Sequence, residues 1–136
     1  MEVMFTYAPT LWVAIGIGGL LLLQIVIADL LSIRAQHKPG FPIEADQHSL
    51  LFRSARVYAN TNETIAAFGL FALVGILAAA SPAWLNGFAL FYFVGRVGHM
   101  LFYYWGLSVL RSLAFGVSLL ALFGMLATAA VAMIGT

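Results

Sequence analysis

The sequence has no cysteine and very little charge. None of its 136 residues is a cysteine, and only 8% are Asp, Glu, Lys or Arg. Without cysteine the chain can form no disulfide framework, thiolate metal site or cysteine nucleophile, so thiol chemistry would need a thiol from a bound molecule. The net charge of +1 gives no electrostatic basis for binding nucleic acid.

The shortage of charge also excludes an ordinary soluble domain. Soluble domains carry about 25% charged residues, whereas 63% of this chain is hydrophobic and its mean hydropathy is +1.02. A chain with so few charged residues cannot cover its surface with polar side chains, and an apolar surface suits lipid better than water. We therefore predict a multi-pass integral membrane protein in contact with membrane lipid. The length leaves room for a single domain, which we place at residues 1–136.

Four long apolar segments are separated by short polar ones. Two prolines, a glycine and mixed charges mark residues 34–49 as a water-exposed loop, and SPAWLNG is typical of a short turn. The last two segments are nearly contiguous and predict an antiparallel pair. The expected fold is all-α, an integral membrane four-helix bundle with spans near residues 9–33, 49–80, 84–105 and 108–134.

Basic residues indicate how this bundle is oriented. Cytoplasmic loops are enriched in Lys and Arg. The first and third loops should therefore face the cytoplasm, and both termini should lie on the other side. The membrane would be the cytoplasmic membrane of a bacterium or the endoplasmic reticulum of a eukaryote. The cations in or near these two loops are Arg34, Lys38, Arg53, Arg56 and Arg111.

Polar residues within three of the spans recur at helical spacing. Ionisable groups inside a span are costly and usually line a protected interior, and residues three or four apart share one helix face. We therefore expect three polar stripes to meet in one enclosed, cation-rich chamber. The stripes are Arg53, Arg56, Asn60 and Glu63; Tyr92, Arg96, His99 and Tyr103; and Ser108, Arg111, Ser112 and Phe115.

Charge within the spans is unbalanced. Glu63 and Arg96 fall at comparable depth, so the simplest arrangement pairs them inside the bundle, and Asp29 is the only other carboxylate of the spans. The remaining arginines then form a surplus of buried cations, which invites an anionic ligand. The chamber is predicted to bind a net-negative small molecule. The three histidines lack ligand spacing, so no metal site is expected.

The order of these motifs resembles one known family. The segment RSARVYANTNETIAAF is similar to the second-helix signature of the MAPEG family, the membrane-associated proteins in eicosanoid and glutathione metabolism. The segments IRAQHK, VGRVGHMLFYYWG and LRSLAF resemble the family's first, third and fourth helices. The similarity is closest to the branch of the microsomal prostaglandin E synthases and glutathione transferases.

The resemblance implies a homotrimer with glutathione held between neighbouring subunits. Arg111 would stabilise the glutathione thiolate, because a nearby cation lowers the pKa of a thiol. Ser112 would donate a hydrogen bond to the sulfur. Arg34 would reach the glutathione from the next subunit. The other implied glutathione-binding residues are Asn60, Glu63, His99 and Tyr103. Arg56 and Arg96 are further candidates for binding it.

The sequence departs from the prostaglandin synthase pattern at two positions. Ala59 stands where that branch has an arginine, and Phe115 stands where it has a tyrosine. The spacing from Arg96 to Arg111 also differs by one residue. The reaction type and the substrate therefore do not transfer with the resemblance.

The predicted function is a membrane glutathione transferase or peroxidase whose thiolate attacks an apolar electrophile or hydroperoxide arriving from the lipid. Two alternatives stay open: a non-enzymatic lipid-binding or scaffold member of the family, and a proton-coupled transporter that uses Asp29 or Glu63. Structural interpretations also remain. Arg96 and Glu63 fit a packing pair, Arg53 fits the headgroup level, and GIGG at residues 16–19 fits close helix contact.

Overall fold

The computed structural model describes residues 1–135, and this range is entirely helical apart from its turns and loops. The all-α prediction is confirmed, and the four long helices begin and end within three residues of the predicted bounds. The short first helix was not predicted, and residue 136 of the predicted domain lies outside the described residues. The helices are α1 (Glu2–Thr6), α2 (Ala8–Arg34), α3 (Leu50–Leu77), α4 (Pro82–Tyr104) and α5 (Ser108–Ile134).

Local sequence determines where the long helices begin. Pro9 and Pro82 occupy the first turns of α2 and α4, where a missing N–H needs no partner. Ser49 caps α3, since its hydroxyl accepts a hydrogen bond from the Phe52 N–H at 3.4 Å. Gly106 adopts a φ of +75° between α4 and α5, a conformation that costs glycine little, and the chain reverses there.

Three of the long helices, α2, α3 and α5, are long and apolar enough to cross a membrane. The chain is therefore an integral membrane protein. The remaining predicted span, α4, is less apolar than these three helices. The reason lies in the composition of α4, whose 23 residues include Asn86, Arg96 and His99. These three side chains lower its hydropathy.

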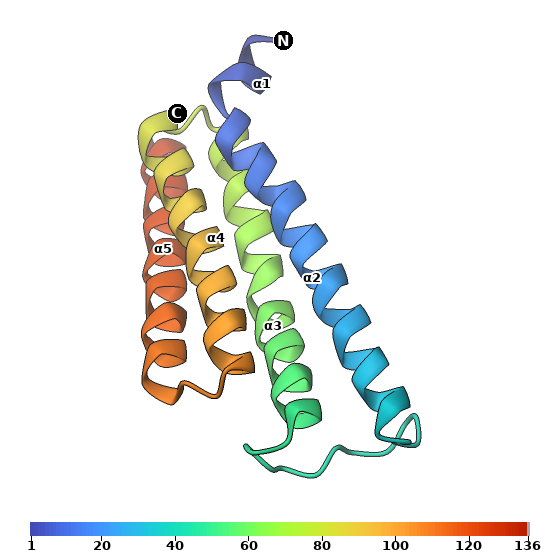
Figure 1. Ribbon diagram of the computed structural model, residues 1–136. Coiled ribbons are helices and arrows are strands. Elements are labelled where there is room, and N and C mark those ends of the chain that lie inside the picture. Colours follow the sequence, from blue (N-terminus) through green and yellow to red (C-terminus); the bar gives the residue numbers. More distant parts are fainter. Residues whose placement is uncertain (136) are drawn as a thin grey trace.

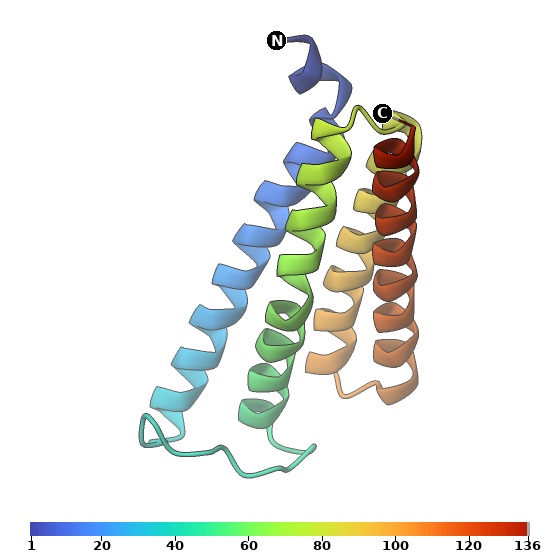
Figure 2. The same cartoon turned by 180° about the vertical axis from the view of Figure 1, so that it is seen from behind.

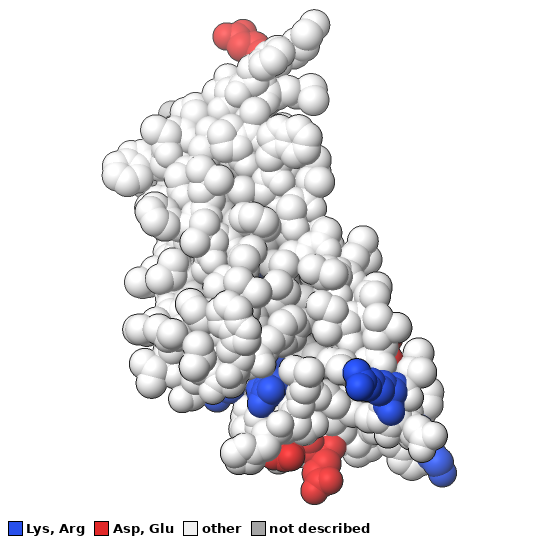
Figure 3. Space-filling view, in the orientation of Figure 1, with Lys and Arg blue, Asp and Glu red and all other residues white. Residues whose placement is uncertain are grey.

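The four long helices run alongside one another, and both termini lie at the same end of the molecule (Figures 1 and 2). We call this the terminal end, and we call the opposite end, with residues 35–49 and the α4–α5 turn, the loop end. Basic side chains gather at the loop end (Figure 3). That this end faces the cytoplasm stays a prediction.

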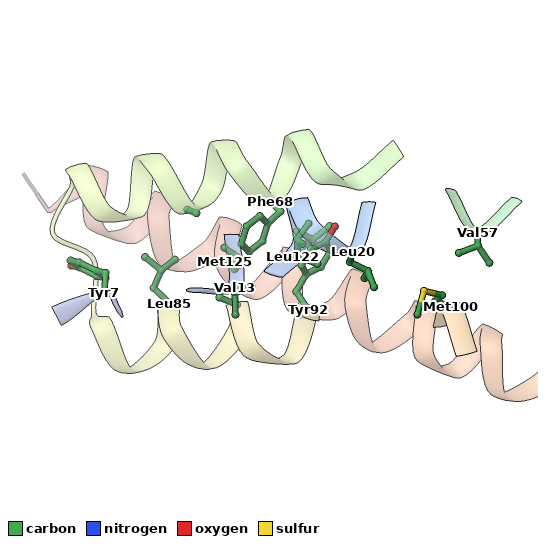
Figure 4. Close-up of a cluster of buried hydrophobic side chains, with 14 of the residues drawn as sticks. Tyr7, Val13, Leu20, Val57, Phe68, Leu85, Tyr92, Met100, Leu122 and Met125 are labelled. Atoms are coloured by element: carbon green, nitrogen blue, oxygen red, sulfur yellow. The ribbon is translucent and has the colours of Figure 1, made fainter. Parts of the chain in front are cut away.

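Apolar side chains from all four long helices form the core (Figure 4). Phe68 of α3 stacks on Tyr92 of α4 with ring centroids 5.0 Å apart. Val57 and Met100 lie apart from the main cluster in this view, toward the loop end. Because Arg96 lies between Tyr92 and Met100 on α4, the gap in the apolar core falls at the level of Arg96.

Hydrogen bonds tie the helices together at the terminal end. The Asn86 Oδ1 atom accepts from the Thr10 hydroxyl at 2.7 Å, and Asn86 Nδ2 donates to the Thr6 carbonyl at 3.0 Å. The Tyr7 hydroxyl donates to the Ala80 carbonyl at 2.6 Å. Toward the loop end, α2 packs less closely against the other helices. Its last buried residue is Gln24, and its final turns diverge from α4 and α5 (Figure 1).

The α4 and α5 helices approach closely at two glycines. A Cβ atom at Gly95 would lie 2.9 Å from the Ser118 backbone N and 3.0 Å from the Ala114 carbonyl, with the Ser118 hydroxyl nearer still. At the terminal end, the Phe88 ring covers Gly124 in the same way. Side chains at these glycines would force the two helices or their rings apart.

We expect Gly95→Ala to lower the free energy of unfolding by about 1–3 kcal/mol, because the α5 backbone has to move away from the new methyl group. Unfolding in mixed detergent micelles, followed by circular dichroism, measures this change. Gly87→Ala is the matched control in the same helix, since nothing lies within 4 Å of a Cβ there. An equal loss in both variants would contradict the packing explanation.

Candidate functional site

Arg96 is the centre of a buried polar network between α3, α4 and α5. Its side chain is 0% exposed. The Nη1 atom donates to the carbonyl oxygen and Oδ1 of Asn60 at 3.0 and 3.1 Å and to the Thr64 hydroxyl at 3.5 Å. The Nε atom donates to the Ser118 hydroxyl at 3.2 Å. Neutral oxygens from two neighbouring helices therefore bind the guanidinium.

Aromatic rings cover the rest of this network. The Arg96 Cζ atom lies 5.9 Å from the ring centroid of Tyr92 and 5.3 Å from that of Phe115, distances at which a ring attracts a cation. His99 is buried and contacts Tyr103 edge-on, with centroids 5.3 Å apart. Phe115 thus covers the guanidinium of Arg96.

The expected ion pair between Glu63 and Arg96 is not formed within the described residues. Glu63 is exposed, and the α3 side chain nearest to the guanidinium is that of Asn60. The face of α3 that is buried includes Thr61 and Phe68. At about 100° per residue, Glu63 lies roughly 200° around the helix from Thr61 and so faces outward.

The predicted stripes do not meet in one enclosed chamber within residues 1–135. Arg34, Arg56 and Glu63 are exposed, and their side chains make no hydrogen bond or ion pair in this part of the chain. The structure therefore divides the predicted site. Its inner part consists of Asn60, Arg96, His99 and Tyr103, and its outward-facing part consists of Arg34, Arg56 and Glu63.

Arg111 lies in the first turn of α5, at the loop end. Its Cζ atom lies 4.4 Å from the centroid of the Tyr103 ring, and its Nη1 atom donates to Gln47 Oε1 at 3.0 Å. The Ser112 hydroxyl donates to the Ser108 carbonyl at 3.0 Å. Arg111 and Ser112 face an open hollow of about 440 Å³. Its lining residues are Ser108, Val109, Arg111, Ser112 and Leu113.

Tyr103 connects the hollow to the buried network. One contact of its ring is with the imidazole of His99, and another is with the guanidinium of Arg111. His99 in turn lies 6.1 Å from the ring of Phe115, which covers Arg96. A continuous row of side chains thus runs from the interior of the chain to the open loop end.

The arginines at this site keep uncompensated charge. Arg53 donates to the carbonyl oxygens of Gln47 and His48, and the hydrogen bonds of Arg96 and Arg111 also go to neutral oxygens. An arginine without a carboxylate partner can bind an anionic ligand strongly. Within residues 1–135 no group of three His, Asp or Glu side chains is close enough to hold a metal ion.

Sequence reasoning missed three polar residues of the site. Ser118 continues the spacing of Ser108, Arg111 and Phe115 by three more residues, and Thr64 follows Asn60 by four, so helical periodicity could have identified both. Gln47 lies in a loop, where no period applies. Its contact with Arg111 depends on how the loop folds back.

Comparison with known protein families supports the resemblance drawn from the motifs. The sequence profile of the MAPEG family matches residues 9–131, a range that begins in α2 and ends in the last turns of α5. A search of curated proteins finds no match to the chain. Since the family match covers most of the sequence, including every predicted site residue, the chain belongs to the MAPEG family.

Proposed function

We propose that the protein is a membrane-bound, glutathione-dependent transferase or peroxidase in which Arg111 stabilises the glutathione thiolate. The MAPEG family includes glutathione transferases and related enzymes. One observation carries the proposal. Arg111 is held by a ring and a neutral amide, and it faces an open hollow together with the Ser112 hydroxyl.

The chemistry of Arg111 suits this role. A free thiol has a pKa of about 8.5, and an adjacent cation favours the thiolate. A guanidinium stays charged at every relevant pH and presents five N–H donors, of which Gln47 occupies one. Ser112 offers a second donor once its hydroxyl turns from the Ser108 carbonyl. The glutathione thiolate displaces halide from an aryl halide to form a C–S bond. With a hydroperoxide, two glutathione molecules are oxidised to the disulfide while the hydroperoxide is reduced to an alcohol and water.

The outward-facing residues favour a site completed between copies of the chain. Glu63 is exposed along a candidate membrane span, where an uncovered carboxylate is costly. We therefore propose a homotrimer in which Arg34 of one copy and Arg56 of the next bind the glutathione carboxylates. Glu63 accepts a hydrogen bond from the amino group of glutathione. The remaining contacts of the tripeptide are assigned to Asn60, His99 and Tyr103.

The same proposal makes α4 a fourth span. Its low hydropathy comes from residues buried in the chain, such as Arg96 and His99, whereas Leu90, Phe91 and Val94 are exposed and apolar. The outer surface of α4 is therefore compatible with lipid. With the loop end at the cytoplasmic side, glutathione reaches the site from water and the lipophilic substrate reaches it from the bilayer.

Purified protein in detergent micelles tests this function. Calorimetry should show saturable glutathione binding, and the protein should catalyse glutathione-dependent turnover of an aryl halide or a lipid hydroperoxide. Native mass spectrometry should report three copies per complex. Binding without turnover of either substrate would favour the scaffold alternative, and absence of binding would refute the proposal.

A further inference from the structure

The loop between α2 and α3 folds back over the loop end of the chain. Gln47 Oε1 accepts a hydrogen bond from Arg111 of α5 at 3.0 Å. The backbone carbonyls of Gln47 and His48 accept from Arg53 of α3 at 3.1 and 3.4 Å. The Asp46 carboxylate accepts from the His48 N–H at 2.9 Å. Residues 46–48 are therefore held between α3 and α5.

Gln47 is the hydrogen-bonding restraint on Arg111. Within residues 1–135 the Arg111 guanidinium also contacts the face of the Tyr103 ring, whose centroid lies 4.4 Å from the Arg111 Cζ atom. A ring face attracts a cation but has no lone pair directed at one N–H group. A hydrogen bond to the amide oxygen of Gln47 does select one N–H group, so it fixes the rotation of the guanidinium on the ring.

The amide of Gln47 orients Arg111 without neutralising it. A carboxylate at this place would form a charge-assisted pair and would compete with an anionic ligand for the guanidinium. An amide oxygen accepts one hydrogen bond and leaves the positive charge available. The other N–H groups of Arg111 make no hydrogen bond within the described residues, so they can point at a sulfur.

Arg53 in turn sets the position of Gln47. Its Nη1 atom binds two successive carbonyls of the loop, and it lies 3.6 Å from where a Cβ would stand on Gly106 of the α4–α5 turn. Arg53 is thus wedged between the loop and that turn. Its two hydrogen bonds keep the backbone of Gln47 at a fixed distance from the start of α5.

We propose that Gln47 is a positioning residue that orients Arg111 toward the thiolate of the bound substrate. The inference rests on the proposed function, because it assigns the loop a task in the same site. The guanidinium is then aligned before glutathione binds, and losing the amide leaves it free to rotate on Tyr103.

Three variants test the inference. Gln47→Ala removes the amide, Gln47→Glu replaces it with a carboxylate, and Gln36→Ala is the control, because the Gln36 side chain makes no hydrogen bond within the described residues. The thiolate fraction of bound glutathione is read from its ultraviolet absorbance. Gln47→Ala should lower that fraction and lower kcat by up to about tenfold, the equivalent of about 1.4 kcal/mol from one hydrogen bond, with the KM for glutathione unchanged. Gln47→Glu should lower the thiolate fraction further, because its carboxylate pairs with Arg111. Gln36→Ala should have the same thiolate fraction and kcat as the parent protein.

A second measurement separates this inference from the proposed function. Arginine-specific modification by phenylglyoxal, followed by mass spectrometry in the absence of glutathione, reports the freedom of Arg111. Faster modification of Arg111 in Gln47→Ala than in Gln36→Ala supports the positioning role even for a protein that turns nothing over. Equal rates overturn it. A parent protein that binds no glutathione refutes the proposed function instead.

Discussion

Arg111→Ala should lower kcat/KM for glutathione-dependent turnover about 100-fold or more at neutral pH, the usual cost of removing a donor that stabilises a developing or resident anion. Without the guanidinium, the pKa of the bound thiol should return toward its free value of about 8.5. The loss should therefore shrink as the pH rises and the thiol ionises unaided. Steady-state kinetics from about pH 6 to about pH 9, a range that brackets the pKa of a free thiol, measures both effects.

Lys38→Ala is the matched control for this substitution. Lys38 is an exposed cation at the same end of the chain, so the variant removes equal charge without touching the hollow. Its activity should stay within about twofold of the parent, since exposed charges contribute little. Full activity in Arg111→Ala would remove Arg111 from the mechanism, and a matching loss in Lys38→Ala would assign the effect to surface charge.

Arg96→Ala should lower the free energy of unfolding by about 3–5 kcal/mol. The substitution leaves a cavity where a fully buried side chain stood, and it removes donors from the oxygens of Asn60, Thr64 and Ser118. Denaturation in mixed detergent micelles, followed by circular dichroism, measures the change.

Arg96→Met separates the two contributions. Methionine is long enough to fill much of the cavity but donates no hydrogen bond, so it restores packing and still leaves the oxygens of Asn60 and Ser118 without this donor. We expect it to cost less than alanine, and the difference between the two variants measures the packing contribution. If methionine costs as much as alanine, the hydrogen bonds rather than the packing make up the contribution of Arg96 to stability.

The helix bounds could be predicted because their signals are local. Pro9 and Ser49 mark the starts of α2 and α3, and polar segments separate the long apolar runs. The assignment of SPAWLNG to a turn was wrong in part, because α4 already begins at Pro82. The first helix escaped prediction since EVMFT is only five residues long, too short to show a helical period. The bounds of α5 needed no correction, because the fourth apolar run begins at Ser108 directly after the α4–α5 turn.

The site could be predicted only in part. Helical spacing grouped Arg96, His99 and Tyr103 correctly, and all three are buried on one face of α4. The stripe on α3 is less regular: at about 100° per residue its four positions fan over roughly 80° of the helix. Asn60 lies on the side of this 80° range that faces the other helices, and Glu63 lies on the side that faces outward. Periodicity identifies a shared face, but tertiary packing decides which edge of it points inward.

The two glycine contacts between α4 and α5 have a mechanical consequence. Sliding one of these helices along the other would drive Ser118 into the backbone at Gly95 and Phe88 into the backbone at Gly124. These contacts fix the register of the pair. The last ten residues of α2, in contrast, follow its last buried residue, Gln24. In the proposed trimer this stretch, which carries Arg34, is the part of α2 that remains to pack against a neighbouring copy.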